Sequence, residues 1–228
     1  MKTNKSIQKS SVDSLDLFHN AEAPPSNDII LDIQKRFLYY NHALAITIKN
    51  AEKQIEDATN EISKWIKNED IVRVIGAGRA RIAASIAANR LHHTGARVYI
   101  IHDLIPLPNS RHGGHILAAS ASGETPDVIG MMRLAKKRNP TIRILGIASY
   151  KAKSFQDLCD IFIPIQDNNI PHYNPLKALA DISEQIISGL LDAIVVAAAN
   201  SLGLSDEDYR RGHEDIGPTG PYLPNSMD

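Results

Sequence analysis

Short apolar runs alternate with helical segments between residues 71 and 165, and this alternation constrains the fold more than any other feature of the chain. Strands that read as continuous apolar runs and alternate with helices are typical of a parallel sheet covered by helices on both faces. The sequence therefore predicts an α/β fold, a three-layer sandwich around a five-stranded parallel sheet. The expected strands are residues 71–75, 97–101, 115–119, 143–148 and 161–165.

Helical patterns fill the segments around these strands. Apolar residues recur near helical spacing from Ile29 onward, and no glycine or proline interrupts them before Gly76. This pattern predicts one long helix or two joined helices that reach to about residue 67. After the last strand, a polar loop at 166–174 precedes a helix with a wide apolar band. The other expected helices are residues 80–91, 128–137, 154–158, 175–201 and 205–211.

The two ends of the chain differ in composition from its middle. Residues 1–26 are rich in Ser, Asn, Lys and Asp, a composition that buries too little apolar area to offset the entropy of ordering. We therefore expect a disordered tail there. Residues 27–216 are expected to form a single domain with an N-terminal helix, and the Gly- and Pro-rich residues 217–228 a C-terminal tail.

Composition and charge argue against several classes of partner. The 228 residues carry 25 Lys and Arg against 26 Asp and Glu, without the basic stripe by which proteins bind nucleic acid. No apolar run approaches the roughly 18 to 20 residues that span a bilayer, and no hydrophobic signal core begins the chain. We expect a cytoplasmic protein without a membrane partner. The only cysteine, Cys159, lies beside an apolar run and is expected to be a buried structural thiol.

Two loops rich in glycine and hydroxyl groups follow the first and third predicted strands. The first contains Gly76, Gly78 and Arg79; the second runs from Ser120 to Thr125 and precedes Pro126, a good first helical residue. Ligands of parallel sheets bind at the carboxyl ends of the strands, and helix N-termini stabilise anions. These loops predict a phosphate cradle. The alternative is a pair of polar loops without a ligand.

Two other ligand classes fit the sequence less well. Arg81 stands where a dinucleotide fingerprint has its third glycine, which favours a compact phosphorylated ligand over NAD. The histidines do not have the spacing of a metal site, so no metal ligands are predicted. Arg111 or His112, on the loop before the third strand, are instead candidates to line the pocket. The histidines considered as metal ligands are His92, His93, His102, His112 and His115.

The motifs together resemble the sugar isomerase (SIS) domain, which binds phosphosugars, and within that superfamily the 6-phospho-3-hexuloisomerase family. Members of that family carry GAGRS, then SGSGET, then a glutamate in a helix before Leu-Asp-Ala, then a tail of the R-R-x-H-A-N-L-E type. The corresponding stretches, within a resemblance over roughly residues 28–216, are GAGRA at 76–80, SASGET at 120–125, Glu184 ahead of Leu191-Asp192-Ala193, and RRGHEDI at 210–216.

The chain departs from the family pattern at three places. Ala80 replaces the family serine, which removes one hydroxyl that the resemblance would assign to phosphate. Arg79 or Arg81 can compensate, because guanidinium groups bind phosphate through paired hydrogen bonds. The segment 170–177 is about three residues longer than in the family. The tail keeps His213 but lacks the final asparagine and glutamate.

The resemblance implies a flavodoxin-like sheet and an isomerase that interconverts 3-hexulose 6-phosphate and fructose 6-phosphate through an enediolate, with neither metal nor cofactor. A carboxylate and a histidine suit the proton transfers, because burial and neighbouring groups can shift the pKa values of both side chains towards neutral pH. Glu184 is expected to be the base, and His213 the acid or ring-proton partner. The residues implied in phosphate binding are Gly76, Gly78, Arg79, Ser120, Ser122, Gly123 and Thr125.

Alternative functions remain open at this point. The substrate of the isomerase could be another sugar phosphate, or the chain could be a non-catalytic phosphosugar sensor. Glu184 could be a salt-bridged residue on a helix face, and His213 an exposed residue of the tail. The apolar first and last long helices predict a homodimer or homotetramer, and the resemblance implies sites at subunit borders.

Overall fold

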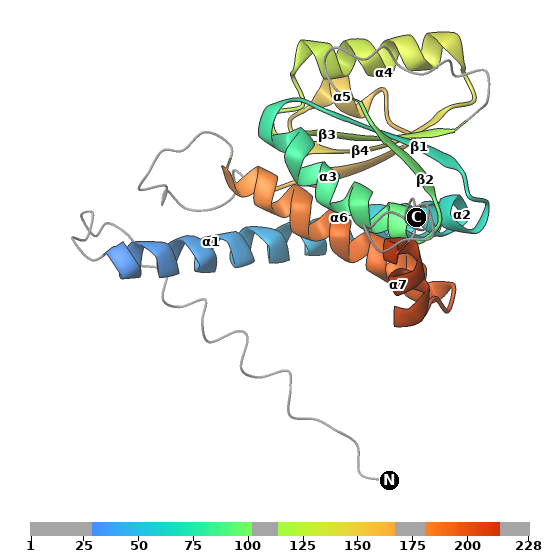
Figure 1. The fold of residues 1–228 in the computed structure, drawn as a ribbon. Coiled ribbons are helices and arrows are strands. Elements are labelled where there is room, and N and C mark those ends of the chain that lie inside the picture. The colour runs from blue at the N-terminus through green and yellow to red at the C-terminus, as the bar shows by residue number, and fades with distance from the viewer. Residues whose placement is uncertain (1–28, 102–113, 167–180, 215–228) are drawn as a thin grey trace, which may run out of the picture.

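A five-stranded parallel sheet forms the centre of the protein (Figure 1). The computed structural model describes residues 29–101, 114–166 and 181–214. The strands of the sheet are β1 (Ile71–Gly76), β2 (Arg97–Ile100), β3 (His115–Ser120), β4 (Arg143–Ser149) and β5 (Ile161–Ile165). The helices are α1 (Ile29–Asn50), α2 (Glu52–Lys67), α3 (Gly78–His93), α4 (Pro126–Arg138), α5 (Lys153–Gln156), α6 (Asp181–Ser201) and α7 (Asp206–Glu214).

The order of the strands is β2-β1-β3-β4-β5, and every neighbouring pair is parallel. The chain therefore turns back between β1 and β3, where the sheet switches its winding direction. In sheets of this order, ligands bind at that switch point, at the carboxyl ends of the strands. The predicted α/β class and the five parallel strands are confirmed.

Helices cover both faces of the sheet, because alternate side chains of each strand point to opposite faces. On β3, Leu117 and Ala119 belong to one buried cluster with residues of α2, α3 and α6, whereas Ile116 and Ala118 belong to another with residues of α4 and α5. Figure 1 shows α4 and α5 on one side of the sheet and α3, α6 and α2 on the other. The result is the predicted three-layer sandwich.

The N-terminal helical run is two joined helices, one of the two predicted forms. α1 and α2 meet at Ala51, which is fully buried and leaves helical geometry with φ −121° and ψ 19°. Beyond the last strand, the predicted start of the long helix at 175 lies outside the described residues. The predicted tails at 1–26 and 217–228 lie outside them as well.

The expectation about bilayer-spanning length was wrong for α6. Its residues Ile182–Ser201 are long and apolar enough to cross a membrane by length and composition, although half of that stretch is buried inside the fold. α6 packs against α3, α2 and α1, so its wide apolar band serves several helices at once. A core helix contacted on several sides needs apolar residues around most of its circumference.

The start of α7 has a side-chain cap, and Cys159 is less buried than expected. Ser205 and Asp208 form a cap at the start of α7: the Asp208 carboxylate accepts hydrogen bonds from the Ser205 backbone N–H at 2.8 Å and from its hydroxyl at 2.6 Å. Cys159 is partly buried, and its thiol donates to the carbonyl of Phe155 at 3.2 Å. Burial, followed by the nearby Asp160 charge, raises the pKa of that thiol to about 12. Cys159 is therefore a structural thiol.

Candidate active site

The two predicted ligand loops start side by side at the switch point of the sheet. Gly76, the last residue of β1, is in register with Ala119 of β3. A side chain at Gly76 would lie 3.0 Å from the Ala119 carbonyl oxygen and 3.0 Å from the Cα of Arg81, which is too close for a Cβ atom. Gly76 thus lets the first turn of α3 fold back against β3. The loops after β1 and β3 therefore start next to each other, at the carboxyl ends of two adjacent strands.

The loop from Ser120 to Thr125 is held in shape by its own hydroxyl groups. The Ser120 hydroxyl accepts a hydrogen bond from the Gly123 N–H at 3.0 Å and lies 3.2 Å from the Thr125 hydroxyl. Ser122 accepts from the Glu124 N–H at 3.2 Å. Ser120 is buried whereas Ser122 is exposed, so Ser120 organises the loop and Ser122 faces the solvent side of it. Their predicted contact with phosphate remains a prediction.

The loop after β1 opens helix α3 with a positive charge. Gly78 has φ +53°, and no side chain caps the helix start at Ala77. The first turn contains Arg79 and Arg81 and no acidic residue. A helix N-terminus already carries a partial positive charge, so arginines placed there favour a bound anion. This end of α3 has the charge that the predicted phosphate site requires.

Glu184, the predicted base, lies directly beside this helix start. Its carboxylate is 3.0 Å from the Arg79 guanidinium, and its side chain is only 15% exposed against 56% for Arg79. Burial raises the pKa of Glu184 above its usual value, and the charge and hydrogen bond of Arg79 oppose that rise. A carboxylate in this setting is better suited to accept a proton than one in water.

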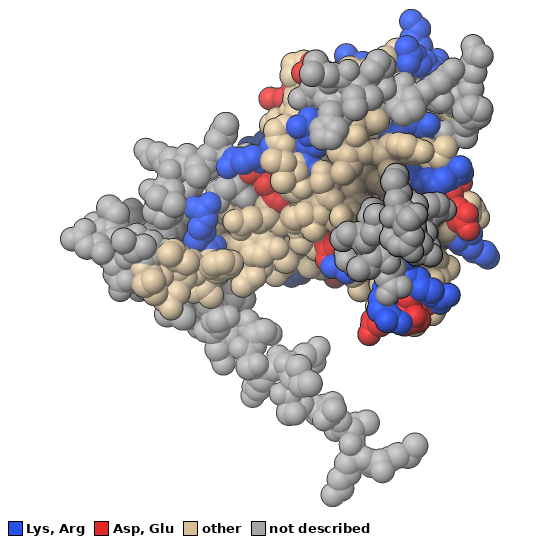
Figure 2. Space-filling view, in the orientation of Figure 1, with Lys and Arg blue, Asp and Glu red and all other residues tan. Residues whose placement is uncertain are grey.

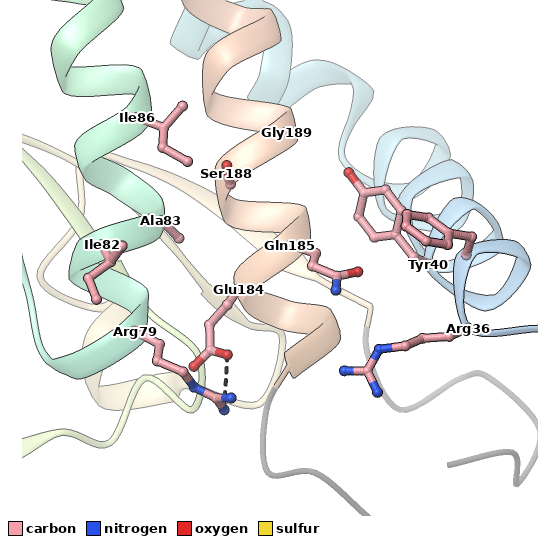
Figure 3. Close-up of a pocket in the computed structure, with 11 residues that line it drawn as sticks. Arg36, Tyr40, Arg79, Ile82, Ala83, Ile86, Glu184, Gln185, Ser188 and Gly189 are labelled. Atoms are coloured by element: carbon pink, nitrogen blue, oxygen red, sulfur yellow. Dashed lines mark ion pairs between the residues drawn. The ribbon is translucent and has the colours of Figure 1, made fainter. Parts of the chain in front are cut away.

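A cavity of about 760 Å³ opens next to this ion pair, between α1, α3 and α6. Figure 3 shows Glu184 and Arg79 at one end of it and Arg36 reaching in from α1. Tyr40, one turn further along α1, packs against Gly189 of α6. The cavity is lined by Arg36, Phe37, Tyr40, Arg79, Ile82, Ala83, Ile86, Glu184, Gln185, Ser188 and Gly189.

The part of this cavity that α1 contributes was not predicted from the sequence. Arg36 and Tyr40 are four residues apart on the first predicted helix and therefore share one face of it. That spacing could have indicated a ligand-binding face, because the guanidinium of Arg36 and the phenol of Tyr40 interrupt an otherwise apolar face of the helix. Gln185 gave no signal, since a polar residue beside Glu184 is unremarkable on a helix.

A single chain does not bring the backbone of His213 to Glu184. His213 lies in α7, and the preceding Gly212 packs against the His93 carbonyl so closely that a Cβ atom there would be 2.3 Å from it. His93 is the last residue of α3, whereas Arg79 is in its first turn. The two ends of that helix are about 20 Å apart at 1.5 Å per residue. The predicted role of His213 therefore requires a second copy of the chain.

The histidines of the described strands and helices do not form a metal site. No group of three or more His, Cys, Asp or Glu residues within 29–101, 114–166 and 181–214 is arranged to hold a metal ion. His92 and His93 lie on α3 with ring centres 6.5 Å apart. His102 and His112, like Arg111, lie outside the described residues.

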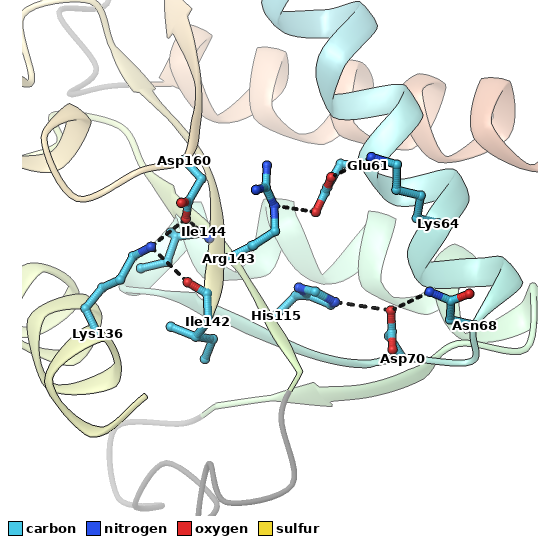
Figure 4. A network of polar contacts seen from close by, with 10 residues as sticks. All are labelled: Glu61, Lys64, Asn68, Asp70, His115, Lys136, Ile142, Arg143, Ile144 and Asp160. Carbon is cyan, nitrogen blue, oxygen red and sulfur yellow. Dashed lines mark hydrogen bonds and ion pairs between the residues drawn. The ribbon is translucent and has the colours of Figure 1, made fainter. Parts of the chain in front are cut away.

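His115 belongs to a polar network at the amino ends of the strands, opposite the ends from which the ligand loops start (Figure 4). It stacks on Trp65 at 4.8 Å between ring centres, and its Nε2 lies 3.2 Å from the Asp70 carboxylate. Nearby, Arg143 at the start of β4 pairs with Glu61 of α2 at 2.6 Å. The network ties α2 to the amino ends of the strands. His115 is therefore a structural residue, as is Asp192, which pairs with Arg90.

Several known proteins are similar in sequence to this chain. No protein-family model matches the chain. It is 24% identical over 179 residues to a 3-hexulose-6-phosphate isomerase of Bacillus subtilis, covering 77% of this chain and 92% of that protein. It is 25% identical over 144 residues to the 3-hexulose-6-phosphate isomerase of Methylomonas aminofaciens, covering 62% and 77%. The chain is thus similar over most of its length to proteins named 3-hexulose-6-phosphate isomerase.

Solved structures have the same SIS-domain fold. A hypothetical protein of Methanococcus jannaschii, whose structure infers a 3-hexulose-6-phosphate isomerase function, superposes with a TM-score of 0.64 at 18% identity, over 78% of this chain and 97% of that one. The NanR protein of Vibrio vulnificus, solved with ManNAc-6P, superposes with a TM-score of 0.58 at 19% identity, over 89% and 70%. These structures thus share the α/β fold of this chain.

Proposed function

We propose that the protein is a phosphosugar isomerase that converts 3-hexulose 6-phosphate into fructose 6-phosphate. The observation that carries the proposal is the partly buried Glu184 carboxylate, 3.0 Å from Arg79 and next to the anion-favouring start of α3. A phosphate held by the two loops would place the sugar carbons towards Glu184. The sequence relatives named 3-hexulose-6-phosphate isomerase support the same reaction.

The proposed reaction moves a ketone from C3 to C2 of the sugar. Glu184 takes the proton from C2, which gives an enediolate shared by C2 and C3. Return of a proton to C3, with transfer of the hydroxyl proton from O2 to O3, completes the product without net oxidation or reduction. The nearby guanidinium group of Arg36 favours the negative charge that develops on the oxygens.

A second copy of the chain would supply His213 and cover an exposed apolar surface. Ile30, Ile33 and Phe37 of α1 are 62%, 47% and 62% exposed, and Ile82 of α3 is 64% exposed. Figure 2 shows few charged side chains on this side of α1. Apolar residues grouped in this way mark an interaction surface. We propose a homo-oligomer in which the partner's α7 completes the site.

The test is to incubate the protein with 3-hexulose 6-phosphate and to follow fructose 6-phosphate by NMR. Arabinose 5-phosphate, ribulose 5-phosphate and sedoheptulose 7-phosphate serve as competing substrates. We expect the highest kcat/KM for 3-hexulose 6-phosphate. Faster turnover of one of the others would change the substrate but keep the reaction class, and no turnover of any of them by folded protein would refute the isomerase.

A phosphosugar sensor is the second candidate, because the NanR protein shares the fold and was solved with a phosphosugar. Sensor and enzyme would both be stabilised by a ligand that binds only the folded state. A thermal-shift panel of the same sugar phosphates, measured beside turnover, separates them. A shift of Tm without product formation favours the sensor.

Restoring the family serine is expected to strengthen phosphate binding. Ala80 is 4% exposed in the first turn of α3, so the A80S hydroxyl would lie at the start of the helix. One added hydrogen bond to phosphate should lower the Kd for inorganic phosphate by about two- to tenfold. Calorimetric titration measures this change. A83S, one turn further and 7% exposed, is the matched control and should leave the Kd unchanged; an equal change in both variants would contradict the prediction.

A further inference from the structure

Arg79 pairs with one anionic group and lies at the place where phosphate is predicted to bind. Its guanidinium is 3.0 Å from the Glu184 carboxylate on α6. Its backbone is in the first turn of α3, next to Gly78, and β1, which precedes this turn, pairs with β3, which precedes the second ligand loop. The long side chain is 56% exposed, so it has room to turn. A phosphate bound at the start of α3 would be a second and more highly charged partner for the same guanidinium.

The groups that line the cavity beside Glu184 come from three helices. The cavity beside it is lined by Arg79, Ile82, Ala83 and Ile86 of α3, by Arg36, Phe37 and Tyr40 of α1, and by Gln185, Ser188 and Gly189 of α6. Burial raises the pKa of Tyr40, so that phenol stays neutral. The charged groups of the described cavity lining are therefore Arg36, Arg79 and Glu184, and Figure 3 marks an ion pair of Glu184 with Arg79.

We propose that Arg79 couples phosphate binding to proton abstraction: it pairs with Glu184 in the free protein and moves to the substrate phosphate in the complex, which frees the carboxylate to act as the base. This inference rests on the proposed isomerase function and deepens it. Arg79 would then be more than a phosphate ligand, because it would also set the state of the base. Sugars without phosphate would meet a site in which Glu184 is still engaged.

The direction of the effect follows from the surroundings of Glu184. Burial raises the pKa of its carboxyl group, and Arg79 lowers it through charge and a hydrogen bond. When Arg79 leaves, the opposing influence is lost and the pKa rises further. A carboxylate with a higher pKa is a stronger base at neutral pH. Phosphate binding would therefore increase the rate of proton transfer as well as the affinity for substrate.

The experiment supplies the sugar and the phosphate group of the substrate as two separate molecules. Turnover of 3-hexulose without its phosphate is measured with and without phosphite dianion, which can occupy the phosphate site by itself. We expect phosphite to increase kcat/KM of the wild type at least about tenfold, the size of one strong charge-assisted hydrogen bond. R79M should lose this activation, and R79K should keep part of it. R90M is the matched control, because Arg90 is also on α3 and pairs with Asp192 of α6.

The pH dependence of the intact substrate gives the second readout. For R79M, the acidic limb of kcat/KM should move to higher pH, because the free protein has lost the group that lowers the pKa of Glu184. The acidic limb of kcat should stay in place, since Arg79 has already left Glu184 in the wild-type complex. R79M that is still activated by phosphite, or that raises KM with both limbs unchanged, would overturn the inference. Absence of wild-type turnover with 3-hexulose 6-phosphate would instead refute the proposed function.

Discussion

Substitution of Glu184 by glutamine is expected to lower kcat with 3-hexulose 6-phosphate by about 10²- to 10⁴-fold, the contribution of a positioned general base. Glutamine has nearly the same shape and can still accept a hydrogen bond from Arg79, 3.0 Å away, but it does not take up a proton. KM should change little, because the phosphate loops are untouched. Steady-state kinetics with product quantified by NMR measures both constants.

The control for E184Q is D192N on the same helix. Asp192 is also a carboxylate of α6 that pairs with an arginine of α3, yet it lies two turns away from the ligand loops. We expect D192N to keep wild-type kcat and to lose some thermal stability. If E184Q and D192N have equal activity, Glu184 is not the base, and the isomerase would need another proton acceptor.

Wild-type activity should also fall on the acidic side at a pH above the ordinary range for glutamate. The base must be ionised to act, so activity is lost as the pH falls through its pKa. Burial raises the pKa of Glu184 in the free protein. The acidic limb of kcat/KM should therefore lie above pH 4.5, the ordinary value for this side chain.

Alanine at Gly123 is expected to disrupt the second ligand loop and to destabilise the fold. Gly123 has φ +71°, a backbone angle that residues other than glycine rarely adopt. An added Cβ would also lie 2.0 Å from the Cβ of Ala152. Overpacking in a core typically costs about 1–3 kcal/mol, and the strained backbone adds to that. We expect a lower Tm and at least a tenfold weaker affinity for inorganic phosphate, because Gly123 holds the Ser120 hydroxyl in the loop.

G130A supplies the comparison for G123A. Gly130 lies in α4, where an added Cβ meets nothing within 4 Å. Alanine is the better helix former, so G130A should raise stability by about 0.5–1 kcal/mol and leave phosphate binding unchanged. Thermal unfolding and calorimetric titration of both variants test the pair. Unchanged phosphate affinity in G123A would show that the loop shape does not matter for the ligand.

Much of the fold could be predicted from sequence because buried parallel strands and helices have distinct apolar patterns. The predicted first strand, 71–75, differs from β1 by the single residue Gly76, which continues the ladder opposite Ala119. The helix break at Ala51 was less predictable, since neither glycine nor proline marks it. That joint is set by tertiary packing, because Ala51 is fully buried.

The site could be predicted only in parts. The two loops were recognisable because each follows a strand and opens a helix, which is a local property. The pairing of Arg79 with Glu184 was not, because it depends on how α3 and α6 lie against each other. The position of Gly212 against His93 is likewise a tertiary contact between distant segments. Local patterns contain no information on such contacts.

The inert thiol of Cys159 makes the protein a ready host for site-specific labels. A thiol reacts as its thiolate, and a pKa of about 12 leaves almost none of that form at neutral pH. A cysteine introduced at the exposed Glu124, on the second ligand loop, would therefore react with a maleimide fluorophore far faster than the native one. A dye at that point sits on the loop at the β1–β3 switch point, and its emission would report ligand arrival in real time without removal of any natural residue elsewhere.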